Sequence, residues 1–329
     1  MPPAASNKKP PNLAVGTHAW LPTDEDVPRQ QAVIASMRQH GVKALDTARM
    51  YGGGASETAI GNQGLGQEFA ITTKAATGVF EGSGNNIVKD ANESLEALKV
   101  KKVRTYLLHG PDETVPLEAQ MDAIQSLYEE GKFDAFGFSN FTQDQVLEYY
   151  NYNKAKNYIL PTVYQSSYSP AVRRNETILF PTLRELGFSI QAYSPMAGGL
   201  LAKTPDFIEQ GKGSWDPSTV MGKVFRDLYY KPSYMNMLEN FGRLSDECGI
   251  SRPGLAYRWV VYHSELDGRL GDEVLVGAST LAQLEETLTE IDKGPLDAWI
   301  VERITGLWDI IKDDAPTDNL ESVRKVFRA

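Results

Sequence analysis

The regular alternation of short apolar stretches with helical patterns constrains the fold of this 329-residue chain more than any other feature. Between the apolar stretches lie helical patterns whose apolar residues recur at three- and four-residue steps, at 27–39, 87–98, 116–130 and 142–150. Such βα alternation implies parallel strands joined by right-handed crossovers. The strand candidates are eight in number, at residues 13–17, 44–46, 69–73, 103–108, 135–139, 160–165, 189–193 and 273–276. Eight is the number of strands in a (β/α)8 barrel, and a chain of this length exceeds the roughly 250 residues that such a barrel typically needs. The chain is therefore predicted to form an α/β TIM barrel.

Some segments depart from this repeat. Residues 201–235 are rich in glycine, proline, lysine and aromatic residues but poor in periodicity, which predicts a long loop after the seventh strand, placed to act as a lid. The patterns over 281–291 and 296–311 predict a closing helix and an extra C-terminal helix. No linker divides the chain, so we expect one domain over 1–329, with peripheral tails at about 1–12 and 314–329.

Composition argues against several classes of partner. With 33 basic and 43 acidic residues the formal charge is −10, which opposes binding to nucleic acid or to an anionic membrane. We expect a cytoplasmic protein, because the chain lacks an apolar run of about 20 residues and its first dozen residues lack the apolar core of a secretion signal. The four histidines have no ligand spacing and Cys248 is the one cysteine, so we expect no metal site.

Four ionisable or polar residues follow β-like stretches near their carboxyl ends: Asp46, Tyr51, Lys74 and His109. In a TIM barrel the active site is built at the carboxyl ends of the strands, so these side chains are predicted to share one catalytic site. Each also has an ordinary alternative. Asp46 could cap a turn, Tyr51 could cover the core, Lys74 could be a solvated charge, and His109 could anchor the turn that follows it.

At these residues the chain resembles a known family, the aldo-keto reductases. The segment Leu-Asp-Thr-Ala-Arg-Met-Tyr-Gly-Gly-Gly-Ala-Ser-Glu at 45–57 is similar to the family's second strand and loop, and Thr73-Lys74 and Leu107-Leu-His109 follow it. Residues 137–140, 161–165 and 192–200 resemble the ends of the next three strands. The likeness covers about 13–311, and its middle third most resembles the aflatoxin aldehyde reductase subgroup.

The resemblance implies reduction of a carbonyl group by a nicotinamide cofactor. Such a reaction needs an acid beside the carbonyl oxygen, and Tyr51 is expected to be that acid. Free tyrosine has a pKa of about 10, so we expect the ammonium of Lys74 to lower the pKa by stabilising the phenolate. Asp46 would hold Lys74 in place, and His109 would donate a hydrogen bond to the carbonyl oxygen or relay a proton.

Later strand ends supply the expected nicotinamide contacts. The amides of Asn140 and Gln165 can hydrogen-bond a carboxamide, and Tyr193 offers a flat face to the ring. By resemblance Ser139 belongs with them, although Ser139 and Asn140 could also cap the next helix. A glycine-rich turn would lie along the pyrophosphate, with its backbone approaching closely, at Ser194, Met196, Gly198 and Leu200.

The segment after the last strand is similar to the family's adenosine-binding segment, at Gly277, Ser279, Thr280, Gln283 and Glu286. It lacks the cations that many relatives place there for the extra phosphate of NADPH. Neutral donors and a helix N-terminus would replace them, assisted by Lys223. Despite these missing cations, the resemblance to the family implies NADPH in preference to NADH. A Gly-x-Gly-x-x-Gly fingerprint after a strand is missing, which argues against a Rossmann domain.

The substrate is expected to be a small carbonyl compound. Met50, Phe80 and Phe225 are apolar candidates for the substrate wall, and a homo-oligomer is possible. Two other functions stay open from the sequence. Barrels of this kind also serve as redox-sensing partner subunits that bind cofactor, and Asp46 with His109 could support a hydrolase without nicotinamide. Reduction of a C=C bond is less attractive, because His109 stands where such relatives carry a carboxylic acid.

Overall fold

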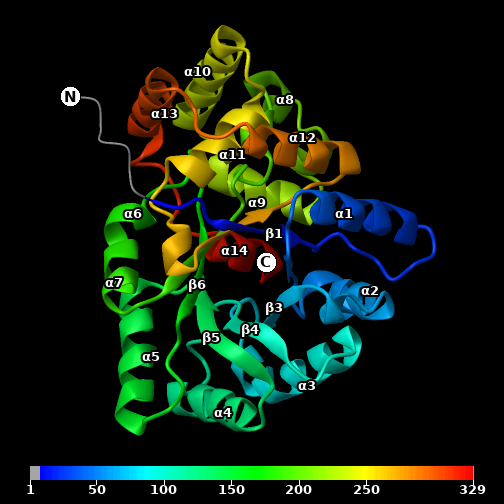
Figure 1. Cartoon of the computed structure of the whole chain (residues 1–329). Coiled ribbons are helices and arrows are strands. Elements are labelled where there is room, and N and C mark those ends of the chain that lie inside the picture. The colour runs from blue at the N-terminus through cyan, green and yellow to red at the C-terminus, as the bar shows by residue number, and fades with distance from the viewer. Residues whose placement is uncertain (1–7, 329) are drawn as a thin grey trace.

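The computed structural model describes residues 8–328 and shows eight parallel strands closed into a barrel in sequence order (Figure 1). The predicted TIM barrel is therefore confirmed. Four of the strands have the predicted bounds, and the others differ by one to three residues at an end. The strands are β1 (Asn12–Gly16), β2 (Ala44–Asp46), β3 (Ala70–Ala75), β4 (Val103–Leu108), β5 (Phe133–Ser139), β6 (Val163–Ser167), β7 (Ser189–Tyr193) and β8 (Glu273–Val276).

The helices surround the barrel, as Figure 1 shows. Their apolar faces pack on the strands in one large core that includes the aromatic side chains of Phe136, Phe138 and Phe141. The helices are α1 (Val27–Gln39), α2 (Ala55–Asn62), α3 (Ile87–Leu98), α4 (Leu117–Glu129), α5 (Gln143–Lys156), α6 (Asn175–Ile178), α7 (Phe180–Glu185), α8 (Pro205–Glu209), α9 (Val220–Tyr229), α10 (Pro232–Cys248), α11 (Arg252–Tyr262), α12 (Leu281–Asp292), α13 (Ala298–Ile311) and α14 (Leu320–Phe327).

The segment after β7 differs from the loop that we predicted for 201–235. It contains α8 and α9, which begin at the capping residues Thr204 and Thr219, whose hydroxyl oxygens accept backbone N–H groups of the first turn. Val224 and Leu228 on α9 are buried. The predicted long segment after β7 is present, but the prediction did not include the helices that it contains.

The C-terminal residues also differ from a peripheral tail. Figure 1 shows α14 close to the barrel, and its Arg324 donates from Nε to the carbonyl oxygen of Gly78 at 2.8 Å and from Nη2 to that of Pro111 at 2.6 Å. Those residues follow β3 and β4. The helix also packs against α9, so it ties together three segments at the mouth of the barrel.

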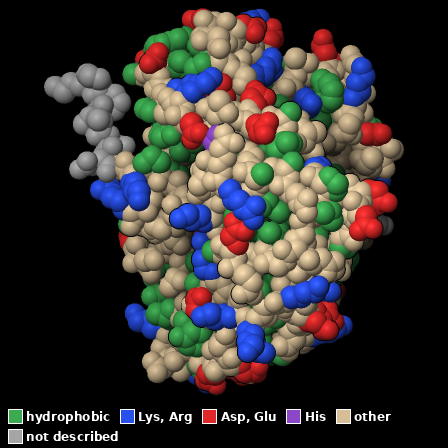
Figure 2. Space-filling view, turned by 45° about the vertical axis from the view of Figure 1, so that its right-hand side comes forward, with side chains coloured by type: hydrophobic (Ala, Val, Ile, Leu, Met, Phe, Trp, Pro, Cys, Tyr) green, Lys and Arg blue, Asp and Glu red, His purple; other side chains and the backbone are tan. Residues whose placement is uncertain are grey.

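The surface shows mixed charge. On the face in Figure 2, basic and acidic side chains are interspersed instead of gathered by sign. Among the described residues, no helix is long and apolar enough to cross a membrane. The first seven residues of the expected N-terminal tail lie outside the described part, while β1 already begins at Asn12.

Candidate active site

A buried ion pair joins the ends of β2 and β3. The Nζ atom of Lys74 donates to Asp46 Oδ1 at 2.7 Å and to the carbonyl oxygen of Thr47 at 2.7 Å. Lys74 is 0% exposed and Asp46 is 3% exposed. Parallel strands end at the same rim of a barrel, so the sequence positions of these two residues bring them together. A buried charge needs such partners, because its desolvation is otherwise very costly.

The Tyr51 ring lies over this pair, on the 3₁₀ turn that follows β2 (Tyr51–Gly54). The Nζ atom of Lys74 is 5.2 Å from the ring centroid. His18 and His109 approach the same ring edge-on, each with a centroid separation of 5.8 Å. The structure therefore brings together the four residues singled out from the sequence, with His18 beside them.

Burial raises the pKa of Tyr51 above its usual value. The charge and hydrogen bond of Lys74 lower it, as expected, while the charge of Asp46 raises it. The net direction is upward, which corrects the expectation of a lowered pKa: desolvation of the hydroxyl outweighs the ammonium. Tyr51 is consequently protonated at neutral pH, which is the state that a proton donor requires.

The charges in the pair follow from the same competition. Burial lowers the pKa of Lys74, but the neighbouring Asp46 and Tyr51 raise it, and the net direction is upward. Burial raises the pKa of Asp46, against the lowering effect of Lys74 and Gln165. The pair is an ammonium and a carboxylate, because Lys74 Nζ donates to two oxygens and both oxygens of Asp46 accept from N–H donors.

His109 is neutral in this environment. Burial, with a smaller contribution from the charge of Lys74, lowers its pKa to about 3. Its Nδ1 atom is buried and has no hydrogen-bond partner within residues 8–328. The backbone oxygen of His109 accepts from Asn140 Nδ2 at 2.8 Å. The imidazole can therefore offer a hydrogen bond to a ligand, but it does not carry a second proton at neutral pH.

A tight turn holds Tyr51 in position. Gly54 has a φ of 94°, and a Cβ atom added there would lie 2.0 Å from Nη1 of Arg49. Arg49 in turn pairs with the fully buried Glu57 at 2.9 Å and with Glu93 at 3.2 Å. The glycine is thus needed both for its backbone conformation and for the close approach of the guanidinium.

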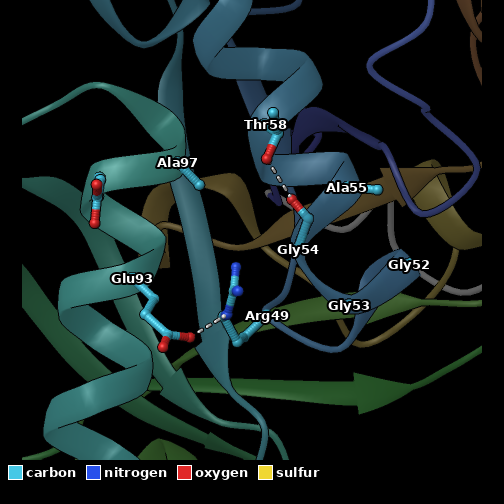
Figure 3. Close-up of a pocket in the computed structure, with 9 residues that line it drawn as sticks. Arg49, Gly52, Gly53, Gly54, Ala55, Thr58, Glu93 and Ala97 are labelled. Atoms are coloured by element: carbon cyan, nitrogen blue, oxygen red, sulfur yellow. Dashed lines mark hydrogen bonds and ion pairs between the residues drawn. The ribbon is translucent and has the colours of Figure 1, made fainter.

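A surface pocket adjoins this turn (Figure 3). It is lined by Arg49, Gly52, Gly53, Gly54, Ala55, Thr58, Glu93, Glu96 and Ala97. In Figure 3 Arg49 reaches toward Glu93 on α3, and Thr58 on α2 bonds to the Gly54 carbonyl oxygen. None of the four candidate catalytic residues lines it. We therefore regard the pocket as the outer side of the Tyr51 turn and not as the reaction site.

The residues expected to contact nicotinamide form a connected group at the ends of β5, β6 and β7. Asn140 donates from Nδ2 to His109 O and to Ser139 Oγ, and its Oδ1 accepts from Tyr193 at 2.6 Å. Both amide hydrogens of Asn140 are therefore already used. The Ser139 hydroxyl donates to the backbone oxygen of Gln165 at 3.0 Å. Asn140 and Ser139 are placed to shape the site more than to donate to a carboxamide.

Gln165 is tied to the ion pair. Its Nε2 donates to Asp46 Oδ2 at 2.8 Å and to Gln191 Oε1 at 3.0 Å. The carbonyl oxygen Oε1 of Gln165 is then the part of this side chain left to contact a ligand. Sequence reasoning missed Gln191, because a polar residue in a strand ordinarily points away from a core.

The turn after β7 has the conformation that a close backbone approach requires. Ser194 and Ala197 have positive φ angles of 53° and 49°, and Gly198 has a φ of 65°. A Cβ atom on Gly198 would lie 2.5 Å from the ring of Phe225. This places Phe225 beside the expected pyrophosphate turn. Met196 lies half-buried in the turn and Leu200 is fully buried.

The start of α12 carries the expected adenosine-binding residues. Thr280 caps the helix, with its hydroxyl oxygen accepting from Gln283 N, while Gln283 Oε1 accepts from Ser279 N at 3.0 Å. Within residues 8–328, the amide hydrogens of Gln283 and the hydroxyl hydrogen of Thr280 have no acceptor, which leaves them to donate to a ligand. Gly277 is held through its backbone N–H and carbonyl by the hydroxyl of Tyr257, each at 3.3 Å.

The other predicted residues lie on several separate elements. Met50 is half-buried immediately before Tyr51, and Phe80 is 50% exposed and meets Phe327 of α14 edge-on at 6.2 Å. Lys223 is exposed on α9, and Glu286 is exposed on α12. Within residues 8–328, no group of three or more His, Cys, Asp and Glu side chains is arranged to hold a metal ion.

Comparisons with known proteins identify the family of this chain. A family model described as "Aldo/keto reductase family" matches residues 12–309. An oxidoreductase of Leptosphaeria maculans, sirO, is 45% identical over 286 residues, covering 86% of this chain and 87% of its own. Aflatoxin B1 aldehyde reductase member 2 of Rattus norvegicus is 33% identical, covering 88% of this chain and 83% of its own. The expected likeness to aflatoxin aldehyde reductases is confirmed.

A solved structure has the same fold. It is an aldo/keto reductase from Klebsiella pneumoniae, in complex with NADP and acetate. The TM-score is 0.63, the sequence identity is 20%, and the match covers 94% of this chain and 93% of that one. At this level of identity the comparison speaks for the barrel alone.

Proposed function

The chain belongs to the aldo/keto reductase family, and we propose that it uses NADPH to reduce an aldehyde or ketone to an alcohol, with Tyr51 as the proton donor. The observation that carries the proton-donor assignment is the buried Lys74–Asp46 pair beneath the Tyr51 ring. When bound, the nicotinamide would supply the hydride. The chain's own residues must then deliver a proton to the carbonyl oxygen and stabilise the charge that develops on it.

Tyr51 suits this role because it is protonated and faces an ammonium. The raised pKa keeps the proton on the hydroxyl at neutral pH, and Lys74 stabilises the phenolate that is left after transfer. Neutral His109 would donate a hydrogen bond to the same carbonyl oxygen. Its unpartnered Nδ1 shows that this imidazole still has hydrogen-bonding capacity within the described part of the chain.

The residues present fit a nicotinamide nucleotide. Within residues 8–328 the carbonyl oxygen of Gln165 accepts no hydrogen bond, so it suits an N–H of the carboxamide, and Tyr193 provides an aromatic face. The turn from Ser194 to Leu200 would accommodate the pyrophosphate. At the start of α12, Ser279, Thr280 and Gln283 would hold the adenosine phosphate, with Gly277 and Glu286 beside them and Lys223 as the added cation. The preference for NADPH over NADH is part of the proposal.

The candidate hydrolase is disfavoured by one observation. Both carboxylate oxygens of Asp46 are engaged, one by Lys74 and the other by Gln165, and the side chain is buried. A carboxylate held in this way and paired with an ammonium is poorly placed to activate a water molecule. A redox-sensing role would use the same site and differs in how quickly the cofactor is released.

The test is a cofactor-consumption screen across a panel of aldehydes and ketones, with NADPH and NADH in parallel. We expect turnover with NADPH for at least one carbonyl, and a loss of about a hundredfold or more in Tyr51→Phe with NADPH binding unchanged. Wild-type turnover in Tyr51→Phe would remove the proton-donor assignment. Tight NADPH binding without turnover of any carbonyl would favour the sensor.

A further inference from the structure

A chain of buried polar side chains runs through the barrel from the candidate active site. Gln165 donates to Asp46 and to Gln191, and Gln191 Nε2 donates to Glu273 Oε2 at 2.7 Å. Gln191 is 3% exposed and Glu273 is 4% exposed. The residues lie side by side in register, Gln165 opposite Gln191 and Gln191 opposite Glu273. Polar groups placed in a barrel interior are costly unless they are paired in this way.

A second ion pair lies at the Glu273 end of this series of hydrogen-bonded side chains. Arg104, near the start of β4, donates to both oxygens of Glu273, from Nη1 to Oε1 at 2.7 Å and from Nη2 to Oε2 at 2.6 Å. Its Nη2 also lies 3.3 Å from Thr72 Oγ1. This bidentate arrangement holds the Glu273 side chain in one place and uses both of its oxygens as acceptors. Glu273 is therefore a fixed acceptor that cannot donate.

The fixed acceptor determines how the two glutamine amides point. Gln191 must present its NH2 group to Glu273, because its carbonyl oxygen would be repelled by the carboxylate. Its Oε1 then faces Gln165, which must present NH2 in turn. Asp46, a second carboxylate, demands the same orientation of Gln165 from the other side. The orientation thus follows from the charges and leaves Gln165 Oε1 as an acceptor.

We propose that Gln191 and Glu273 are positioning residues that hold Gln165 with its carbonyl oxygen toward the cofactor, where it accepts an N–H of the nicotinamide carboxamide. The inference rests on the proposed cofactor site. It predicts that the protein binds NADPH more tightly than a cofactor analogue in which the carboxamide is replaced by a group of the same shape without N–H donors. Neither residue touches the cofactor, so the effect passes through Gln165.

The discriminating probe is the reduced 3-acetylpyridine analogue of NADPH, in which a methyl group replaces the amide nitrogen. Dissociation constants for NADPH and for the analogue are measured by quenching of tryptophan fluorescence. One hydrogen bond of ordinary strength corresponds to roughly a two- to tenfold preference, so we expect wild-type protein to bind NADPH tighter than the analogue by that factor.

Glu273→Gln is the sharpest variant. Arg104 would take the carbonyl oxygen of the new amide, leaving its NH2 toward Gln191, which then reverses and turns its own NH2 toward Gln165. Asp46 still accepts from the NH2 of Gln165, so two NH2 groups face each other and displace Gln165, which moves its Oε1 away from the cofactor. We expect the preference for NADPH to fall to about onefold. The double variant Gln191→Glu/Glu273→Gln moves the carboxylate from position 273 to position 191. There it accepts from Gln165 on one side and from the new amide at position 273 on the other. We expect this variant to restore the preference for NADPH.

Each result decides. Loss of the preference in Glu273→Gln and its return in the double variant support the inference. An unchanged preference in Glu273→Gln, or wild-type protein that binds NADPH and the analogue equally, overturns it. If Glu273→Gln does not fold, Gln191→Met is used instead. We expect a partial loss of the preference for NADPH in this variant, and an unchanged preference would refute the inference. Failure of wild-type protein to bind NADPH at all would instead refute the proposed function.

Discussion

Replacing Lys74 by methionine removes the buried ammonium beneath the Tyr51 ring and keeps much of the side-chain volume. The ammonium lies 5.2 Å from the ring centroid, and at an effective dielectric constant of about 20 a unit charge at that distance stabilises a phenolate by roughly 3 kcal/mol. This corresponds to about two pK units. The pKa of Tyr51, already raised by burial, should therefore rise further by about that amount.

The assay is the pH dependence of kcat/KM for alcohol oxidation with NADP⁺. In this direction Tyr51 must be ionised to accept the proton, so the rate climbs with pH until the pKa of Tyr51 is reached. A pKa raised by about two units lowers the oxidation rate roughly a hundredfold at any pH below the wild-type pKa of Tyr51, and it moves the alkaline plateau to higher pH. A folded Lys74→Met protein with the wild-type pH profile would refute the reasoning.

Stability must be controlled in this experiment. Lys74→Met leaves the buried Asp46 carboxylate without its ammonium, and breaking such a pair costs about 3–5 kcal/mol. The double variant Lys74→Met/Asp46→Asn removes both charges and should recover most of that stability in urea unfolding. Its Tyr51 pKa should rise less than in Lys74→Met, because the charge of Asp46 also raises that pKa.

Three further predictions follow from the geometry. His109→Gln should lower kcat about a hundredfold and leave the pH profile between about pH 5 and 8 unchanged, since a histidine with a pKa of about 3 does not titrate there; a shifted profile would contradict this. Gly54→Ala, whose Cβ would clash with Arg49, should lower the free energy of unfolding by about 1–3 kcal/mol and should lower kcat. Unchanged thermal unfolding and unchanged kcat would contradict the idea that this turn requires glycine. Ending the chain at Asn319 removes the links from Arg324 to the loops after β3 and β4, so KM for the carbonyl should rise while Kd for NADPH changes little.

The barrel was predictable because its signals are local. The strand at 103–108 and the helix at 87–98 carry their apolar patterns within a few residues, and parallel strands necessarily gather Asp46 and Lys74 at one rim. The helices α9 and α14 were missed because each buries few side chains, and their stability comes from packing on each other. Gln191 and Glu273 were missed for another reason. Their partners are distant in sequence, and only barrel closure shows that they point inward.

The direction of the Tyr51 pKa was beyond sequence reasoning, because it depends on how burial and charge balance. That balance has a consequence for the reduction direction. As a carbonyl is reduced, negative charge develops on its oxygen before or while Tyr51 gives up its proton, and the field of Lys74 stabilises that charge on either oxygen. Removing Lys74 should therefore slow reduction as well, although Tyr51 begins fully protonated at neutral pH. Because no group then titrates, the loss in reduction should be independent of pH between about pH 6 and 8, in contrast to the shifted profile for oxidation. Equal pH dependence in both directions would show that Lys74 acts on the Tyr51 proton alone.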